Sequence, residues 1–452
     1  MIYFINNNPQ LIEGWGCKTA TIEDLLQWSY GKKVIAIDTE TEGLFDFDND
    51  VIMLQIGDAN DQFVIDCRNV PVTKLKPLLE DPEVLKVFWN AKFDMNFLKF
   101  SFGFNLNNIH DCFLVECLLN AGYDDAELGL GAASKKYLNK TLNKAVRNKF
   151  VGLSGTPYTE TQIVYGAEDV EVLLKIKDIQ DQELERHRLK NVARLENLAV
   201  CVLADIEYNG MAIDIKKWID VANETKTLVD EYTRDLDSYV LSDPRLSRFV
   251  PEYTQGNLFG YEERRIQINW GSPAQKTAVL QAVSLNVVNS DIRELLRYRS
   301  EPLVALLIEY SKYAKLANAF GKDFLKYINP NTNRVHQSLW QILSTGRMSS
   351  SEPNITQIPS KGKLGVLIRS AFVPQSGYKF VGGDFSSMEL RVIADQSQDP
   401  LWIEAYNNDE DLHSKLAALT FNIPLEDVRN PTPFKPTMTY RDVQKTINFG
   451  LA

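Results

Sequence analysis

The sequence predicts an α/β domain, followed by a mainly helical region and then by a mixed α+β region. Three observations predict this order. Up to about residue 190, β-branched runs broken by turn residues alternate with helical patterns. An apolar period of three to four residues begins at residue 191. From about residue 331, loops rich in Ser, Pro and Asn separate a short apolar run from helical stretches.

The length of 452 residues allows about three domains of the usual ~100–200 residues, and we place them at 1–190, 191–330 and 331–452. Hydrophobic residues make up 44% of the chain, enough for a sizeable core. A net charge of −11 argues against binding nucleic acid through overall charge, but it is compatible with a local basic groove. The five scattered cysteines suggest neither a disulfide framework nor a zinc site.

The start of the chain lacks the pattern of a secretory signal, and no run of about 18 apolar residues occurs. We therefore expect a cytoplasmic protein without membrane contact.

In the first region, residues 32–44 predict a strand that ends in acidic residues, and residues 51–66 predict two strands around a turn at 57–61. Helical patterns such as KFDMNFLKFSF follow between short strand-like pieces.

In the second region, residues 191–210 predict a helix with one apolar stripe that Gly210 ends; the stripe comprises Leu195, Leu198, Val202 and Ile206. Residues 241–268 hold Pro, Gly and Ser and predict an irregular insertion. In the third region we expect a strand at 378–385 and helices at 400–420 and 437–452.

Four acids and a tyrosine stand out in the first region. Asp38 and Glu40 are two apart on a predicted strand, so their carboxylates face the same way. Asp94 lies near the start of a predicted helix, and Tyr165 and Asp169 are four apart on one helix face. Taken singly, each is an ordinary strand-end or helix residue.

Taken together, the order DxE, NxxFD and YxxxD resembles the three motifs of the 3′→5′ DEDD exonuclease superfamily, in its tyrosine-bearing branch. The resemblance implies a ribonuclease H-like mixed sheet and two Mg²⁺ or Mn²⁺ ions about 4 Å apart. Their ligands would be Asp38, Glu40, Asp94 and Asp169, and Tyr165 would orient the attacking water.

The second half carries longer motifs. TGRMSSSEPNITQIPSKGKLGVLIRSAFVP (345–374) is similar to the signature of DNA polymerase family A, and GDFSSMELRVIA (383–394) is similar to its motif A. DLHSKLAALTF (411–421) and RDVQKTINFG (441–450) resemble two later segments, the second being the opening of motif B. The resemblance implies a right-hand polymerase with a helical thumb and an incomplete α+β palm and fingers.

Roles follow from the matched positions. Asp384 would bind both polymerase metal ions, and Glu389 would exclude a ribose 2′-OH. The deoxynucleoside triphosphate (dNTP) substrate would be bound by His413, Arg441, Lys445 and Phe449. Gln341 and Arg347 would contact the primer–template minor groove, with a further contact from Arg369. Ser387, Phe385 and Trp340 depart from the family's pattern.

The family's motif B continues into Tyr-Gly, and its motif C supplies a second metal-binding carboxylate; this sequence stops at NFGLA, before either. We therefore expect weak polymerisation by this chain alone and a second polypeptide that supplies the rest of the palm and fingers. A split gene, separately encoded subunits and truncation all fit.

The expected partners are primer–template DNA and single-stranded 3′ ends, in replication or repair within a bacterial cell or a phage-infected host. Two alternatives stay open. One is a stand-alone 3′→5′ exonuclease, and the other is a non-catalytic primer–template binding subunit.

Overall fold

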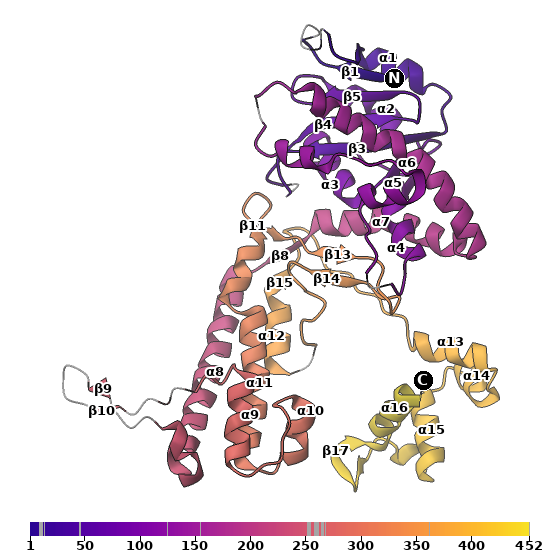
Figure 1. Ribbon diagram of the computed structural model, residues 1–452. Coiled ribbons are helices and arrows are strands. Elements are labelled where there is room, and N and C mark those ends of the chain that lie inside the picture. Colours follow the sequence, from indigo (N-terminus) through magenta and orange to yellow (C-terminus); the bar gives the residue numbers. More distant parts are fainter. Residues whose placement is uncertain are drawn as a thin grey trace. The chain divides into compact units, whose positions relative to one another are not determined.

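The computed structural model describes residues 1–452 except 9–11, 13, 45–46, 124, 154, 251–254, 257–261, 264–265, 267, 361 and 452. The chain divides into two compact units, Met1–Tyr378 and Lys379–Ala452 (Figure 1).

The first unit begins with a seven-stranded mixed sheet in the order β2-β1-β5-β4-β3-β6-β7. Its strands are β1 (Ile2–Ile5), β2 (Lys18–Thr19), β3 (Val34–Thr41), β4 (Val51–Gly57), β5 (Gln62–Asp66), β6 (Leu85–Phe88) and β7 (Ile109–Asp111). The β3–β4 and β4–β5 pairs are antiparallel, and the other pairs are parallel. These strands confirm the α/β prediction, including the strand at 32–44 and the two strands of 51–66.

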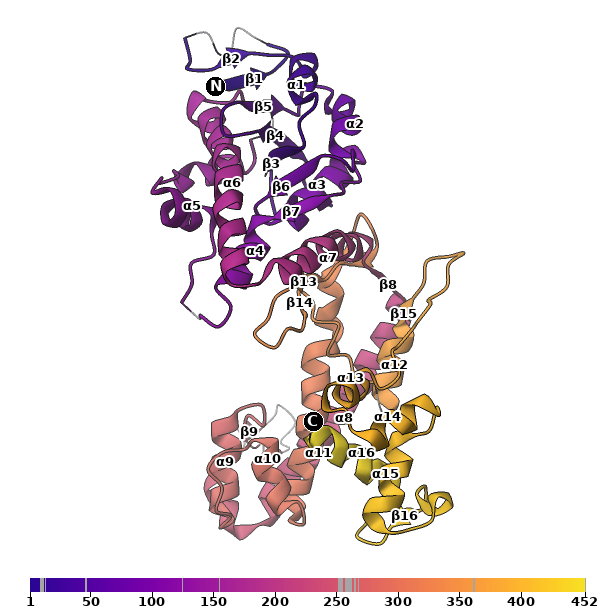
Figure 2. The same cartoon turned by 90° about the vertical axis from the view of Figure 1, so that its right-hand side faces the viewer.

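Helices cover both faces of this sheet, as Figure 2 shows. The helices are α1 (Ile22–Ser29), α2 (Lys76–Leu79), α3 (Ala91–Phe102), α4 (Cys112–Leu119), α5 (Leu130–Leu138) and α6 (Glu160–Arg186). Ile35 and Ile37 of β3 join the core on the side of α1, α2 and α3, whereas Ala36 joins the core on the side of α5 and α6. This alternation assigns every β3 side chain to one face or the other.

The rest of the first unit is mainly helical, and its long helices α8 and α11 pack against each other. Its helices are α7 (Lys190–Asn209), α8 (Ile215–Ser242), α9 (Pro273–Ala282), α10 (Ile292–Leu295), α11 (Pro302–Phe320) and α12 (Lys363–Ala371). A small sheet has the order β11-β12-β8-β15, and β13 (Ser338–Trp340) pairs with β14 (Ser349–Ser351) in a hairpin. The small-sheet strands are β8 (Met211–Ile213), β11 (Ile328–Asn329), β12 (Arg334–Val335) and β15 (Phe372–Val373).

The irregular insertion expected at 241–268 is only partly described. It contains a 3₁₀ helix at Pro244–Phe249 and the short pair β9 (Gln255–Gly256) and β10 (Glu262–Glu263). Residues 251–254, 257–261, 264–265 and 267 of this insertion lie outside the described residues. The predicted domain limits at 190 and 330 fall inside the first unit and stay predictions.

The helix predicted at 191–210 is present as α7, and Gly210 follows it with a φ of +52°. No other described residues bury its predicted apolar stripe: Leu195 and Leu198 are each 63% exposed. The buried face of α7 holds Ala193, Val200, Leu203 and Ala204 instead. The sequence period therefore predicted the helix but not the face that packs in this unit.

The second unit is mostly helical, and the helices expected at 400–420 and 437–452 are present. Its elements are α13 (Met388–Ser397), α14 (Pro400–Asn407), α15 (Leu412–Phe421), α16 (Tyr440–Leu451), β16 (Pro431–Thr432) and β17 (Lys435–Thr439). The strand predicted at 378–385 is wrong, because these residues form neither strand nor helix. A strand needs a hydrogen-bonded neighbour, and no described strand pairs with this segment, in which Val381 is 96% exposed.

Candidate exonuclease and nucleotide-binding sites

Strand β3 fixes the direction of two predicted acids. Asp38 and Glu40 lie on the same face as Ala36, which is packed against α6, and they stand two residues apart near the end of the strand. Asp38 is opposite Gln55 of β4 in the antiparallel register. The backbone pairing therefore holds both carboxylates on a rigid element.

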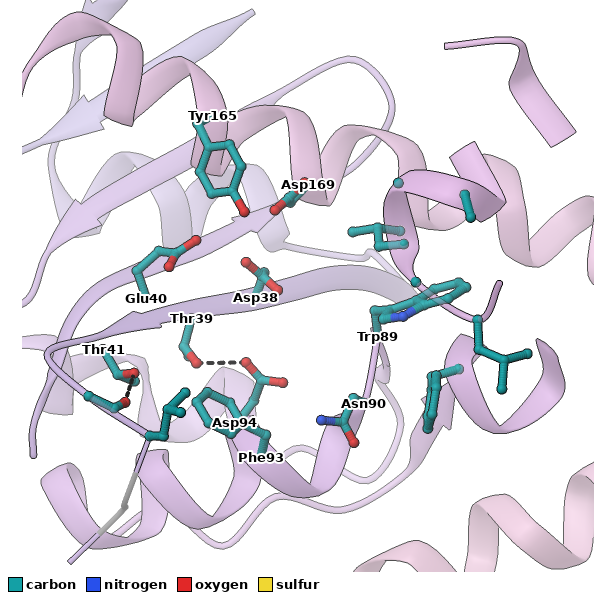
Figure 3. A pocket seen from close by; sticks show the side chains of 18 of the residues that line it. Asp38, Thr39, Glu40, Thr41, Trp89, Asn90, Phe93, Asp94, Tyr165 and Asp169 are labelled. Carbon is teal, nitrogen blue, oxygen red and sulfur yellow. Dashed lines mark hydrogen bonds between the residues drawn. The ribbon is translucent and has the colours of Figure 1, made fainter. Parts of the chain in front are cut away.

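Helix α6 brings the next two predicted residues to the same place. It begins after Thr159, whose side chain accepts a hydrogen bond from the Gln162 backbone N–H in a reciprocal capping box. Tyr165 and Asp169 follow one turn apart and are both buried, at 4% and 3% exposure. Figure 3 shows both side chains directed toward Asp38 and Glu40.

Asp38, Glu40 and Asp169 form a cluster whose ligand oxygens all lie within 4.8 Å of one another. Carboxylate oxygens at this spacing are suited to a hard divalent cation such as Mg²⁺ or Mn²⁺. Burial raises the pKa of Tyr165, and the negative charges of Asp169, Glu40 and Asp38 raise it further. Its phenol therefore keeps its proton at neutral pH.

Asp94 lies on the other side of β3. It belongs to the first turn of α3 and accepts a 2.6 Å hydrogen bond from the Thr39 hydroxyl, the dashed line in Figure 3. Burial raises the pKa of Asp94 to about 7. The structure thus brings three of the four predicted metal ligands into one cluster and places the fourth against Thr39, lining the same cavity.

The start of α3 is held by a buried acid that the sequence did not single out. Asp111 accepts 2.9 Å hydrogen bonds from the backbone N–H groups of Asn90 and Ala91, and Asn90 adopts φ +71°. Burial raises the pKa of Asp111 to about 6. Its carboxylate fixes the backbone from which Asp94 projects.

All five predicted exonuclease residues line one cavity of about 820 Å³. Trp89, Phe113 and Trp340 line it as well. None of these three was predicted from the sequence as a site residue, although Trp340 departs from the family's pattern. No local pattern signals their meeting, because they come from distant parts of the chain.

The predicted DNA contacts of the first unit have different surroundings. Gln341 is only 6% exposed, and its amide donates a 2.7 Å hydrogen bond to the Glu196 backbone oxygen of α7. Arg347 is exposed. Arg369 is also exposed, and its guanidinium donates to the backbone oxygens of Ile358 and Pro359.

In the second unit, helix α16 carries three of the predicted nucleotide-binding residues. Arg441 pairs with Asp411, with 3.1 Å between Nη2 and Oδ1, and Lys445 is exposed. The centroids of the Phe449 and His413 rings lie 5.9 Å apart. Burial lowers the pKa of His413, whose Nδ1 lies 2.9 Å from Asn448 Nδ2.

Asp384 and Glu389 are exposed, Asp384 in the irregular segment before α13 and Glu389 in the first turn of that helix. Four of the predicted nucleotide-binding residues therefore lie on two packed helices, α15 and α16, whereas the predicted metal ligand Asp384 lies on neither.

Comparisons with known proteins match two family models along the chain. Residues 17–185 match the family model described as 3′-5′ exonuclease, and residues 261–452 match the one described as DNA polymerase family A. DNA polymerase I of Pseudomonas aeruginosa is 30% identical over 412 residues, covering 85% of this chain and 40% of that protein. DNA polymerase I of Aquifex aeolicus is 27% identical over 443 residues, covering 92% of this chain and 67% of that protein.

A solved structure extends the likeness to the fold. The Pol domain of Pol1 from M. smegmatis, in complex with DNA primer-template and dNTP, has a TM-score of 0.73 and 25% sequence identity. The match covers 99% of this chain and 71% of that one. The chain spans less than half the length of the first curated relatives that it matches, at 40%, 35% and 46%. None of the described helices combines the length and apolar character needed to cross a membrane.

Proposed function

We propose, on the premise that this chain belongs to DNA polymerase family A and carries a 3′→5′ exonuclease domain, that it edits DNA 3′ ends and takes part in templated DNA synthesis. The observation that carries the editing function is the cluster of Asp38, Glu40 and Asp169 beside Tyr165. We place the editing function in residues 1–190, the thumb in 191–330, and part of the palm and fingers in 331–452.

The acid cluster fits two Mg²⁺ or Mn²⁺ ions. Three largely buried carboxylates within 4.8 Å repel one another unless a cation balances them, and hard oxygen donors suit these ions. Asp38, Glu40 and Asp169 would hold the metal, and Asp94 would complete the set by turning from Thr39. When bound, such ions activate a water and stabilise the leaving 3′-oxygen.

Tyr165 would position the attacking water. Its raised pKa keeps the hydroxyl protonated, so it acts as a hydrogen-bonding group and not as a base. Its place one turn before Asp169 directs the hydroxyl toward the same point as the metal ligands. Tyr165 thus supplies orientation.

In the second unit, Arg441, Lys445 and His413 would bind the dNTP triphosphate, and Phe449 would pack against its sugar and base. Positive charges directed from one helix face suit a group that carries several negative charges. Glu389 would exclude a ribose 2′-OH, and Asp384 would hold the two ions of the polymerase reaction. The exposed positions of Asp384 and Lys445 leave both available to a ligand.

In the first unit, Gln341, Arg347 and Arg369 would contact primer–template DNA. Support comes from the likeness to a Pol1 structure that contains such DNA, and from the exposed guanidinium groups of Arg347 and Arg369. Gln341 would have to leave Glu196 to reach a minor groove.

The relatives named above are bacterial, and we propose a cytoplasmic role in bacterial or phage DNA replication or repair.

A paired assay tests this assignment. Purified residues 1–452 are mixed with Mg²⁺ and a 5′-labelled primer–template, with and without dNTPs. Shortening without dNTPs supports editing by this chain, and extension with dNTPs supports its part in templated synthesis. Absence of both activities would contradict both proposals and favour a DNA-binding subunit.

A further inference from the structure

Hydrogen bonds join the hairpin β13–β14 to helix α7 through the residues before and after Trp340. The Leu339 backbone N–H donates a 2.6 Å hydrogen bond to the Glu207 carboxylate, and the Gln341 amide donates to the Glu196 backbone oxygen. Leu339 and Gln341 are 7% and 6% exposed. Successive side chains of an extended chain point in opposite directions, so Trp340 projects away from α7. There it lines the exonuclease cavity.

The Trp340 ring is held in place but is not buried. Its Nε1–H donates a 2.7 Å hydrogen bond to the Ile342 backbone oxygen, and 43% of the residue is exposed. The Phe113 ring meets it edge to face, with centroids 5.6 Å apart and planes at 79°. The centroid of the Trp89 ring lies 6.2 Å from that of the Phe113 ring. These three rings form an aromatic wall of the cavity that contains the acid cluster.

This aromatic wall could supply attraction between the cavity and a DNA strand. The carboxylates of Asp38, Glu40 and Asp169 repel the phosphates of a DNA strand unless metal ions balance them, and they offer no apolar surface to its bases, so base contacts have to come from other groups in the cavity. Every base presents a π-face to an aromatic ring, and such stacking is independent of sequence. Only unpaired bases expose those faces, which suits a site for frayed 3′ ends.

We propose that Trp340, with Phe113 and Trp89, stacks the unpaired bases of a single-stranded 3′ end in the exonuclease cavity. The inference rests on the proposed editing function and adds a residue from the polymerase side of the chain to it. Trp340 immediately precedes Gln341, a predicted primer–template contact. Two adjacent residues, the last of β13 and the one after it, would therefore serve both DNA-binding tasks.

The competing explanation is that Trp340 only fills the rim of the cavity. Phe keeps a π-face and Leu keeps apolar bulk without one, so Trp340→Phe and Trp340→Leu separate stacking from filling. Tyr30→Ala is the matched control, because Tyr30 is an aromatic residue of the same unit, 91% exposed and outside the cavity lining.

Binding is measured on the full chain in the hydrolysis-deficient Asp38→Ala/Glu40→Ala background, by fluorescence anisotropy with labelled single-stranded dT and dA oligonucleotides. We expect Trp340→Ala and Trp340→Leu to weaken binding by about 5- to 100-fold for both sequences. Trp340→Phe and Tyr30→Ala are expected to stay within about threefold of the parent. In the active background the KM for single strands should rise more than kcat falls.

Equal affinity of Trp340→Leu and the parent would overturn stacking, as would a loss confined to one base type. Because the binding measurement needs no hydrolysis, it decides the role of Trp340 separately from the editing function. Absence of cleavage by the parent chain would instead contradict the proposed exonuclease.

Discussion

At the scale of single residues, the candidate editing site contains two kinds of group. Some are carboxylates that could bind metal ions, and others orient water or fix the backbone. Asp38, Glu40 and Asp169 converge as ligands, whereas Tyr165 retains a proton beside them. Asp111 accepts hydrogen bonds from the backbone N–H groups of Asn90 and Ala91 and so fixes the backbone before Asp94. Replacing each class should therefore give a different kinetic result.

Removing the Tyr165 hydroxyl should slow the chemical step without preventing substrate binding. We expect Tyr165→Phe to lower kcat for single-strand cleavage by about 10- to 1000-fold, because water orientation is lost while the metal ligands stay. The KM should change by less than about threefold. Single-turnover cleavage in Mg²⁺ measures this, and a large rise in KM with unchanged kcat would mean that Tyr165 binds substrate.

Asp94 should make stability depend on pH in the absence of metal. Its pKa is about 7 in the folded chain and about 3.9 in unfolded peptides, so the folded state binds more protons between these values. Stability should then fall as the pH rises from about 4 to 7. Asp94→Asn lacks this dependence, so its Tm relative to wild type should rise on the order of 5 °C from pH 5 to pH 8 in EDTA.

Thermal unfolding of both proteins across that pH range is the measurement. A constant Tm difference would contradict the raised pKa of Asp94. Thr39→Val should lower the stability of the wild type at every pH, since it removes the hydroxyl that donates to the buried Asp94 carboxyl.

At the scale of elements, the approach of α6 to the sheet determines where Tyr165 and Asp169 stand. Gly166 lies between them, and a Cβ there would be 2.6 Å from Gln55 Nε2. Gln55 is fully buried on β4, opposite Asp38, and its Cγ and Cδ would also lie 3.1 and 3.2 Å from that Cβ. A small residue against a long one therefore sets the distance between helix and sheet.

Gly166→Ala should push α6 outward and cost about 1–3 kcal/mol of unfolding free energy. Exonuclease kcat should fall as well, since Tyr165 and Asp169 move with the helix. Adding Gln55→Ala makes room for the new methyl group, so the double variant should recover part of both losses. A double-mutant cycle by urea unfolding and by cleavage rate measures the coupling, and strict additivity would contradict this contact.

The helices and strands also differ in how well the sequence predicted them. Strands β3, β4 and β5 were predictable because their apolar runs and turn residues are local signals, and the acid cluster followed from spacing on one strand and one helix. The strand at 378–385 failed because an apolar run does not reveal whether a neighbouring strand exists. The exposed stripe of α7 has the same cause. The spacing of Leu195 and Leu198 predicts a helix, but it does not predict which other element, if any, packs against that face.

At the scale of the whole molecule, contacts between distant parts of the chain were beyond sequence reasoning. Trp340 reaches Phe113 across more than two hundred residues, and Glu207 joins Lys92 to the hairpin through Leu339. Family resemblance supplied motif order but not this packing, because Trp340 departs from the family's pattern. These contacts make the exonuclease cavity a property of the first unit as a whole.

Every residue that lines the cavity belongs to Met1–Tyr378. A chain shortened after Tyr378 should therefore cleave single strands at a rate within about threefold of residues 1–452. A chain shortened after Leu189 should bind single strands more weakly, because it lacks Trp340. Loss of cleavage on removal of 379–452 alone, in a folded protein, would contradict an editing site confined to the first unit.

We propose that Asp38, Glu40 and Asp169 hold the metal ions of a 3′→5′ exonuclease. The most direct measurement is the time course of a 5′-labelled single-stranded oligonucleotide with residues 1–452, in Mg²⁺ and in EDTA, beside the Asp38→Ala/Glu40→Ala variant. We predict stepwise shortening from the 3′ end in Mg²⁺, with a loss of at least about 1000-fold in EDTA and in the variant. Shortening that persists in the variant, or no shortening in Mg²⁺ or Mn²⁺, would contradict the account.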